Sequence, residues 1–227
     1  EVRRWLDLVV SLLEREYGVP QWRSRRDPLS ELIYTVLSQN TSDANSLRAF
    51  PQLWEVFGSW EAIARADVDA VAGAIRVGGL HQVKAPRIQA ILRAIAAERG
   101  YYDLSFLEDM PLEEARAWLR RLPGVGPKSA ACVLMFSLVR PALPVDTHVY
   151  RVARRLGLIG PKVGREQAHE HLEALVPTEQ VYSFHVNMVR HGRQVCQALR
   201  PQCHACALSP GCPTGRSILG IAGPLPY

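Results

Sequence analysis

Lysine is scarce in this chain, although the chain is basic. Its 227 residues include 27 Lys and Arg against 22 Asp and Glu, which gives a formal net charge of +5 and a pI near 9.1. The lysines are only three, Lys84, Lys128 and Lys162. Arginine does not lose its proton in a protein, so a reaction that needs an amine nucleophile has few candidate side chains. The positive charge favours polyanionic partners such as nucleic acid without identifying one.

Long apolar runs are absent as well. The longest, such as residues 130–139, are far shorter than the roughly 20 residues that span a bilayer, so we expect no membrane segment. No apolar signal core follows residues 1–7, so we expect no secretory leader. Like-charge blocks, low-complexity segments and internal repeats are also missing, which is typical of an ordinary globular protein.

Strand alternation is missing, whereas apolar residues recur at helical spacing along most of the chain. A stripe of apolar residues at 2–17 predicts a first helix, and Asp27 as N-cap with Pro28 at the first helical position predicts a second over residues 28–38. Further helices are expected at 43–57, 60–66, 68–75, 84–98, 112–121, 127–139, 147–157, 165–175 and 178–191. The predicted class is all-α, with a loose tail from 213 to 227.

Four of the five cysteines crowd the C-terminal region as C-x6-C-x2-C-x5-C: Cys196, Cys203, Cys206 and Cys212. A disulfide framework is disfavoured because there is no secretion signal. Zinc sites usually pair two close dyads, whereas this stretch has one dyad flanked by single cysteines, so the spacing favours an iron–sulfur centre and leaves zinc as the alternative. The fifth cysteine, Cys132, lies in an apolar helical stretch and is interpreted as core.

Residues 122–130 read L-P-G-V-G-P-K-S-A and lie between two predicted helices. The glycines allow a tight turn with exposed amides, and a helix start directly behind them can hold a phosphate without reading sequence. A P-loop would need glycine where the chain has Leu122 and Pro127. A purely structural corner between two helices is the alternative.

Two ionisable residues near these features are candidates for chemistry. Lys128 falls in the first turn of a predicted helix, where the helix dipole favours the neutral amine that a nucleophile requires. Asp146 reads as the N-cap of the helix that begins near Thr147, and a carboxylate held there can stabilise positive charge that develops on a sugar. Capping alone would also explain Asp146. The seven histidines are interpreted as structural.

Five segments together resemble the endonuclease III family, over residues from about 28 to 212. The turn at 122–130 is similar to the family's L-P-G-V-G-x-K-[ST]-A hairpin, 145–148 to its V-D-T-H, and 191–196 to its H-G-R-x-x-C entry into the cysteine cluster. Residues 37–43 and 79–88 are similar to its two loops L-S-x-x-T-D and G-L-x-x-x-K-A-x-x-I. The cysteine spacing agrees too.

The resemblance implies a two-lobed helix-hairpin-helix DNA glycosylase with a C-terminal iron–sulfur cluster loop. One domain would be the helical barrel at 28–140, and the other, at 1–27 and 141–227, would hold a [4Fe–4S] cluster on the four cysteines. The partner would be double-stranded DNA with damaged bases or abasic sites. We expect a monomeric bacterial enzyme, cytoplasmic and associated with the nucleoid.

The resemblance also implies site roles. Lys128 would attack the sugar and Asp146 would assist, so that a damaged pyrimidine is removed and the strand is cut on the 3′ side by β-elimination. The expected DNA-binding residues belong to the two loops, the hairpin and the cysteine region: Gln39, Asn40, Leu80, Gly124, Val125, Gly126, Ser129, Arg193 and Arg200.

Two positions depart from the family pattern. Pro127 stands where many relatives carry a basic residue, and His81 stands where tyrosine is common. A neighbouring branch that excises mismatched adenine uses a glutamate on the helix before the first loop, but here that position is Thr35, with Glu31 one turn earlier. A thymine-mismatch branch has a tyrosine in the hairpin in place of Lys128. A non-catalytic DNA-binding or redox-sensing module is the alternative of a different class.

Overall fold

The computed structural model describes residues 1–225 and, within that range, contains helices and no strand. The predicted all-α class is therefore confirmed. The chain forms two compact units. The first unit takes both ends of the chain, Glu1–Trp22 and the part from Pro141 onward, and the second is Arg23–Arg140.

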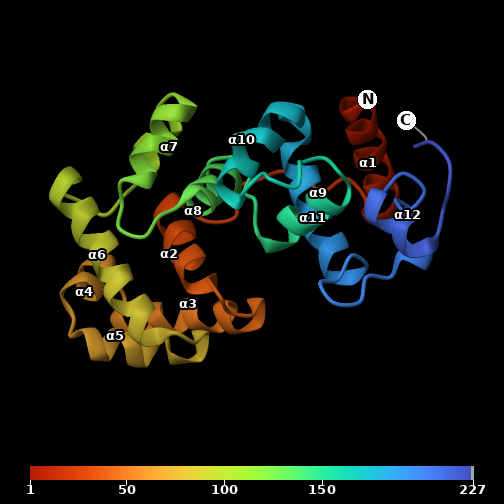
Figure 1. The fold of residues 1–227 in the computed structure, drawn as a ribbon. Coiled ribbons are helices and arrows are strands. Elements are labelled where there is room, and N and C mark those ends of the chain that lie inside the picture. Colours follow the sequence, from red (N-terminus) through yellow and green to blue (C-terminus); the bar gives the residue numbers. More distant parts are fainter. Residues whose placement is uncertain (226–227) are drawn as a thin grey trace. The chain divides into compact units, whose positions relative to one another are not determined.

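The second unit is built on α2, whose apolar face forms the centre of its core. Helix α2 packs against α3, against α8 and against η3, the π-helical turn that continues α8, and Figure 1 shows α2 beside α8 although the two lie far apart in the sequence. The elements of this unit are α2 (Pro28–Ser38), α3 (Asp43–Phe57), α4 (Trp60–Arg65), α5 (Val68–Ala74), η1 (Arg76–Gly78), α6 (His81–Arg99), η2 (Ser105–Glu108), α7 (Leu112–Arg120), α8 (Pro127–Cys132) and η3 (Val133–Ser137).

The first unit joins the N-terminal helix to the C-terminal region. Helix α11 packs against both α1 and α9. Trp5 is buried and its indole N–H donates to the carbonyl of Leu156 at 2.7 Å, while a Cβ built on Gly211 would lie 2.4 Å from the Trp5 ring. The elements are α1 (Val2–Tyr17), α9 (Thr147–Arg155), α10 (Arg165–Leu175), η4 (Thr178–Gln180), α11 (Val181–Gln194), η5 (Cys203–Ala205) and α12 (Pro213–Leu219).

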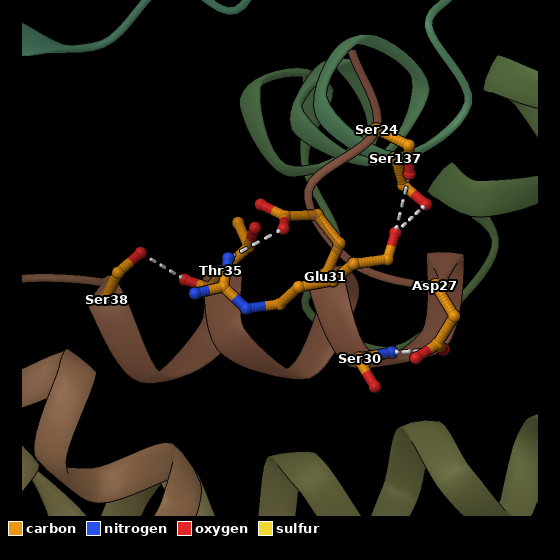
Figure 2. Close-up of polar contacts among 8 residues, drawn as sticks. Ser24, Asp27, Ser30, Glu31, Thr35, Ser38 and Ser137 are labelled. Carbon is orange, nitrogen blue, oxygen red and sulfur yellow. Dashed lines mark hydrogen bonds and ion pairs between the residues drawn. The ribbon is translucent and has the colours of Figure 1, made fainter.

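Helix capping explains why the predicted start of α2 is correct and why the predicted loose tail is in part a helix. Asp27 caps α2 as predicted, because its side chain accepts the N–H of Ser30 at 2.9 Å (Figure 2). The predicted loose tail is wrong for 213–219, which forms α12. Cys212 accepts the N–H of Gly215 at the start of that helix, and Gly220 ends it in the left-handed conformation. Residues 226–227 of the predicted tail lie outside the described residues.

Several predicted boundaries moved; the helix predicted over 178–191, for example, is α11 (Val181–Gln194). Two of the shifts have clear local reasons. Helix α6 begins at His81 and not at residue 84, because Leu80 takes a left-handed backbone with φ 49° and its carbonyl accepts the N–H of Lys84 at 2.9 Å. The helix predicted over 127–139 is α-helical to Cys132 and then continues as η3, ending at Ser137. Positions near a helix end are the least determined by sequence periodicity.

The turn between α7 and α8 is anchored by buried apolar side chains and opened by glycine. Leu122 and Val125 are buried, and the N–H of Val125 donates to the carbonyl of Leu122 at 3.1 Å. Gly124 between them has φ +70°, and a Cβ built there would lie 2.7 Å from Nε of Arg87. The turn therefore requires glycine at position 124 on two separate grounds.

Lys84 is a buried structural lysine. It is 2% exposed, and its Nζ donates to the carbonyls of Leu37 at 2.6 Å and of Gly78 at 3.0 Å. Burial lowers the pKa of Lys84. Thr41 also donates to the carbonyl of Gly78. These bonds tie the end of α2 to the segment that precedes α6, and so hold two loops together.

Among the described residues, no helix combines the length and apolarity that crossing a membrane requires.

Replacing Lys84 should destabilise the protein. We expect Lys84→Met to lower the free energy of unfolding by about 2 kcal/mol, because two charge-assisted hydrogen bonds are lost. This loss is partly offset, because burying a methionine side chain does not require removing water from an ammonium group. Urea denaturation measures the change. Lys162→Met, at an exposed lysine, should change it by less than about 0.5 kcal/mol. Equal effects of the two substitutions would contradict the structural role of Lys84.

The turn offers a second matched pair. Gly124→Ala should lower the free energy of unfolding by about 1–2 kcal/mol from the left-handed backbone alone, and more if Arg87 must move. Gly126 has an extended backbone with φ −92°, and within the described residues nothing lies within 4 Å of a Cβ built there. Gly126→Ala should therefore be neutral or slightly stabilising. Denaturant unfolding of both variants measures the change. A larger loss of unfolding free energy in Gly126→Ala than in Gly124→Ala would refute this account.

Candidate functional site

Lys128 lies directly behind the glycine turn, as the second residue of α8, and is partly exposed. The backbone enters this helix through extended Gly126 and through Pro127 at the first helical position. Pro127 has no N–H to lose there, so the helix start tolerates this departure from the family pattern. Lys128 thus stands in the first turn, as the sequence predicted.

The structure brings two predicted DNA-binding residues together beside Lys128. Nε2 of Gln39 donates to Oγ of buried Ser129 at 3.3 Å, and Oε1 of Gln39 accepts from Nη1 of Arg87 at 2.9 Å. Arg87 thus contacts Gln39 and lies close to Gly124. Sequence analysis missed Arg87, although it occupies a variable position of the 79–88 motif, three residues after Lys84.

Asn40 and Leu80 share an uncommon backbone. Both are exposed non-glycine residues with positive φ, 51° for Asn40 and 49° for Leu80. The loops that carry them are joined through Lys84 and Thr41. Left-handed backbone at a non-glycine residue has a cost and persists where the surrounding contacts enforce it, often at binding sites. An exposed leucine held in this way is suited to entering an apolar gap in a partner.

The three lysines have different surroundings. Lys84 is buried with two carbonyl acceptors, whereas Lys162 is exposed in the segment between α9 and α10 of the first unit. Lys128 combines partial exposure with a helix N-terminus. Its setting is therefore the one among the three that suits a nucleophile.

Asp146 caps α9 in the first unit. Its Oδ1 accepts the N–H of His148 at 2.9 Å and of Val149 at 2.8 Å, and the residue is partly exposed. The neighbouring imidazole of His148 is 3.1 Å from Nη2 of Arg151, which agrees with its interpretation as a structural histidine.

The four clustered cysteines line one cavity in the first unit. Cys203 and Cys212 are buried, Cys196 and Cys206 are partly exposed, and all four are free thiols. Cys132 is buried in α8 of the second unit, as expected of a core residue.

Hydrogen-bond donors point at two of the sulfur atoms. Nη1 of Arg155 lies 3.3 Å from Sγ of Cys196, and the N–H of Gly215 lies 3.3 Å from Sγ of Cys212. Nε2 of His191 lies 3.6 Å from Sγ of Cys206. Burial raises the pKa of Cys212 to about 11 and also raises the pKa of Cys203 and Cys206. Thiolates in this cavity therefore need a compensating cation.

The thiols form a donor set for a metal centre. Four cysteines around one cavity, with N–H donors toward sulfur, suit an iron–sulfur cluster, and four thiols are also a ligand set of structural zinc.

Arginines fix the loop between the first two of these cysteines. Arg155 donates to the carbonyls of Gln197 at 2.7 Å and Ala198 at 2.8 Å, and Arg151 donates to the carbonyl of Cys196 at 3.0 Å. Of the predicted DNA-binding residues, Arg200 lies exposed within this loop and Arg193 lies exposed just before it. The loop thus presents positive charge from a backbone that other arginines hold in place.

Comparison with known proteins agrees with this description. Residues 33–178 match the family described as "HhH-GPD superfamily base excision DNA repair protein". Endonuclease III of Thermotoga maritima is 35% identical over 193 residues, which cover 85% of this chain and 86% of that protein. A putative DNA glycosylase of Arabidopsis thaliana is 38% identical over 165 residues, 73% of this chain, and the chain spans 56% of its length.

Solved structures extend the likeness to nearly the whole chain. A trapped covalent intermediate of endonuclease III with DNA aligns with a TM-score of 0.83 at 27% identity, covering 96% of this chain and 98% of that one. The family match, the glycine turn before Lys128 and the four-cysteine cavity agree with one another. The chain belongs to the HhH-GPD superfamily of base-excision DNA repair proteins and resembles endonuclease III within it.

Proposed function

We propose that this chain is a bifunctional DNA glycosylase and abasic-site lyase. It removes oxidised or otherwise damaged pyrimidines from double-stranded DNA and then cleaves the strand on the 3′ side of the abasic site by β-elimination. The observation that carries the proposal is the position of Lys128, partly exposed in the first turn of α8 and directly behind the glycine turn. Membership of a base-excision repair family supports it.

In the proposed reaction the amine of Lys128 attacks C1′ of the deoxyribose. The bond from C1′ to the base breaks and the base leaves with the bonding electrons, while the carboxylate of Asp146 stabilises the positive charge that develops on the sugar. The nitrogen then loses a proton, and its lone pair forms a second bond to C1′ as the C1′–O4′ bond breaks. O4′ takes up a proton, which leaves the opened sugar attached to Lys128 as a Schiff base. Loss of a C2′ proton expels the 3′ phosphate and cuts the strand.

The surrounding residues would hold the DNA. The amides of Gly124, Val125 and Gly126 and the hydroxyl of Ser129 bind a phosphate next to the lesion. Gln39, Asn40 and Leu80 fill the gap that a flipped nucleotide leaves in the duplex. Arg193 and Arg200 contact the backbone, so affinity falls as salt rises.

Borohydride trapping tests the nucleophile. Wild-type protein mixed with duplex DNA that contains an abasic site should form a covalent adduct on reduction. Lys128→Ala should form at least about 10³-fold less, because no amine replaces it, while it still binds the duplex in a mobility-shift assay. Lys162→Ala is the matched control and should trap like the wild type. An undiminished adduct in Lys128→Ala would refute the assignment.

The proposal includes a [4Fe–4S] cluster on Cys196, Cys203, Cys206 and Cys212. The donor set fits, since four thiols line one cavity and N–H groups point at two of the sulfurs. When bound, the cluster would supply a positively charged core that stabilises four thiolates and so organises the loop that carries Arg200; it takes no part in the sugar chemistry.

Metal analysis and absorption test the cluster. Purified protein should be brown, with broad visible absorption and about four iron atoms per chain, the composition of a [4Fe–4S] cluster. Cys203→Ser should lose colour and iron and should melt at a lower temperature, because the cavity then lacks one ligand. Cys132→Ser should keep both iron and colour. Colourless protein with one equivalent of zinc would overturn the cluster.

A further inference from the structure

An arginine-rich pocket lies next to the cysteine cavity in the first unit. It opens beside α9 and is bounded by the start of α10, by the loop between the first two clustered cysteines and by the start of α12. Half of its lining residues are arginines and none is acidic; the set is Thr147, Tyr150, Arg151, Arg154, Arg155, Arg165, Ala198 and Thr214. This arginine pocket therefore concentrates positive charge that no carboxylate in its walls offsets.

Two of the four arginines hold the walls of the pocket. Arg151 donates to the carbonyl of Cys196 at 3.0 Å, and Arg155 donates to two carbonyls in the loop that follows Cys196. A carbonyl satisfies an N–H group but carries no net charge, so both guanidiniums keep their positive charge. These two arginines thus shape the pocket and also add to its positive potential.

The other two arginines share one aromatic ring. The guanidinium carbons of Arg154 and Arg165 lie 5.8 Å and 5.7 Å from the centre of the Tyr150 ring. The hydroxyl of Tyr150 donates to the carbonyl of Val163 at 2.8 Å, which fixes the segment that leads into α10. Cation–π attraction to a single ring therefore holds two guanidiniums in the same neighbourhood.

Neither of these two guanidiniums is used inside the protein. In the part of the chain that the structure describes, Arg154 and Arg165 form no hydrogen bond and no ion pair, and both are exposed. Glu166 follows Arg165 but is exposed and does not line the pocket. Each guanidinium offers a planar fork of N–H donors that matches the oxygens of a phosphate. Because like charges held together repel each other, an oxyanion is the partner that this arrangement suits.

We propose that the arginine pocket binds phosphates of the DNA backbone outside the lesion. The chain belongs to a DNA repair family, and the pocket begins at Thr147, the residue that follows Asp146. Arg154 lies eight residues after Asp146 along α9, which corresponds to roughly 12 Å of helix. One DNA strand advances about 3.4 Å per phosphate. A strand that follows α9 would therefore place in the pocket phosphates about three or four nucleotides from the sugar at Asp146.

The inference extends the proposed function without depending on its chemistry. It rests on that proposal only in placing the lesion sugar beside Asp146. The predicted contacts Arg193 and Arg200 belong to the cysteine region, whereas Arg154 and Arg165 come from α9 and α10. Phosphate contacts of this kind add affinity and fix the position of the duplex without reading base sequence.

The salt dependence of DNA binding tests the pocket. The purified full chain is titrated onto a duplex that carries a tetrahydrofuran abasic analogue, which has no aldehyde to react, and fluorescence anisotropy gives Kd at several salt concentrations. Each phosphate contact contributes about −0.9 to the slope of log affinity against log salt. Arg154→Gln and Arg165→Gln should each bind about tenfold more weakly at low salt, with a slope shallower by about one.

Two further variants separate the pocket from net charge. Arg4 is exposed on α1 of the same unit and lies outside the pocket, so Arg4→Gln removes one positive charge elsewhere and should keep the wild-type slope. Arg154→Lys keeps the charge but loses the fork. It should keep the wild-type slope and lose only part of the affinity.

Neutral phosphate analogues locate the contact. A methylphosphonate replaces one phosphate at a time along both arms of the duplex. Wild-type protein should lose about tenfold in affinity at one or two positions, about three or four nucleotides from the lesion, and Arg154→Gln should lose nothing further there. Equal losses in the two proteins at every position would refute the DNA contact.

Inorganic phosphate distinguishes the DNA backbone from a free anion. In the absence of DNA, phosphate is added at constant ionic strength and the melting temperature is measured. Variants that bind DNA like the wild type, together with a phosphate-induced rise in melting temperature in the wild type alone, would overturn the assignment to DNA in favour of a free phosphate. Variants that match the wild type in every measurement would refute the phosphate site. Absence of a borohydride adduct in the wild type would sink the lyase proposal and leave these binding results standing.

Discussion

An amine that attacks a sugar in DNA must be neutral when it attacks, although it works beside phosphates that favour its protonated form. The second unit is arranged around this conflict. Lys128 stands in the first turn of α8, where the helix N-terminus disfavours positive charge. The turn before it depends on Gly124, whose backbone and surroundings leave no room for a side chain. Two buried residues, Leu122 and Val125, hold that turn in place.

Charges buried nearby extend the same arrangement. The ammonium of Lys84 donates hydrogen bonds to two carbonyls and so fixes the loops that carry Asn40 and Leu80. Glu31 forms a buried ion pair with Arg26 at 3.1 Å on the face of α2 that packs into the unit.

The first unit addresses a different electrostatic problem. Its four thiols line a cavity where burial raises the pKa of Cys212 to about 11, so they become thiolates only against a strong positive charge. Trp5 from α1 and the arginines of α9 hold the segments around this cavity. In the proposed function, binding of a cluster would be coupled to folding of the region that carries the exposed Arg193 and Arg200.

Residue types at single positions, such as helix caps and turn glycines, predicted much of this structure from the sequence. Asp27 and Pro28 predicted the start of α2, and the two glycines predicted the turn, because caps and turns depend on residue type at one position. The Arg26–Glu31 pair, the burial of Lys84 and the contact between Gln39 and Arg87 depend on tertiary packing that periodicity does not encode. Helix α12 was missed because a cysteine sulfur caps it. The roles of Lys128, Asp146 and the DNA-binding residues came from family resemblance and stay predictions.

Peptide mapping of the reduced protein–DNA adduct tests the central claim most directly. After borohydride reduction, nuclease and protease digestion, tandem mass spectrometry locates the residue that carries the deoxyribose remnant. The account predicts the remnant on Lys128 and on neither Lys84 nor Lys162. A remnant on another amine, including the N-terminus, would contradict it.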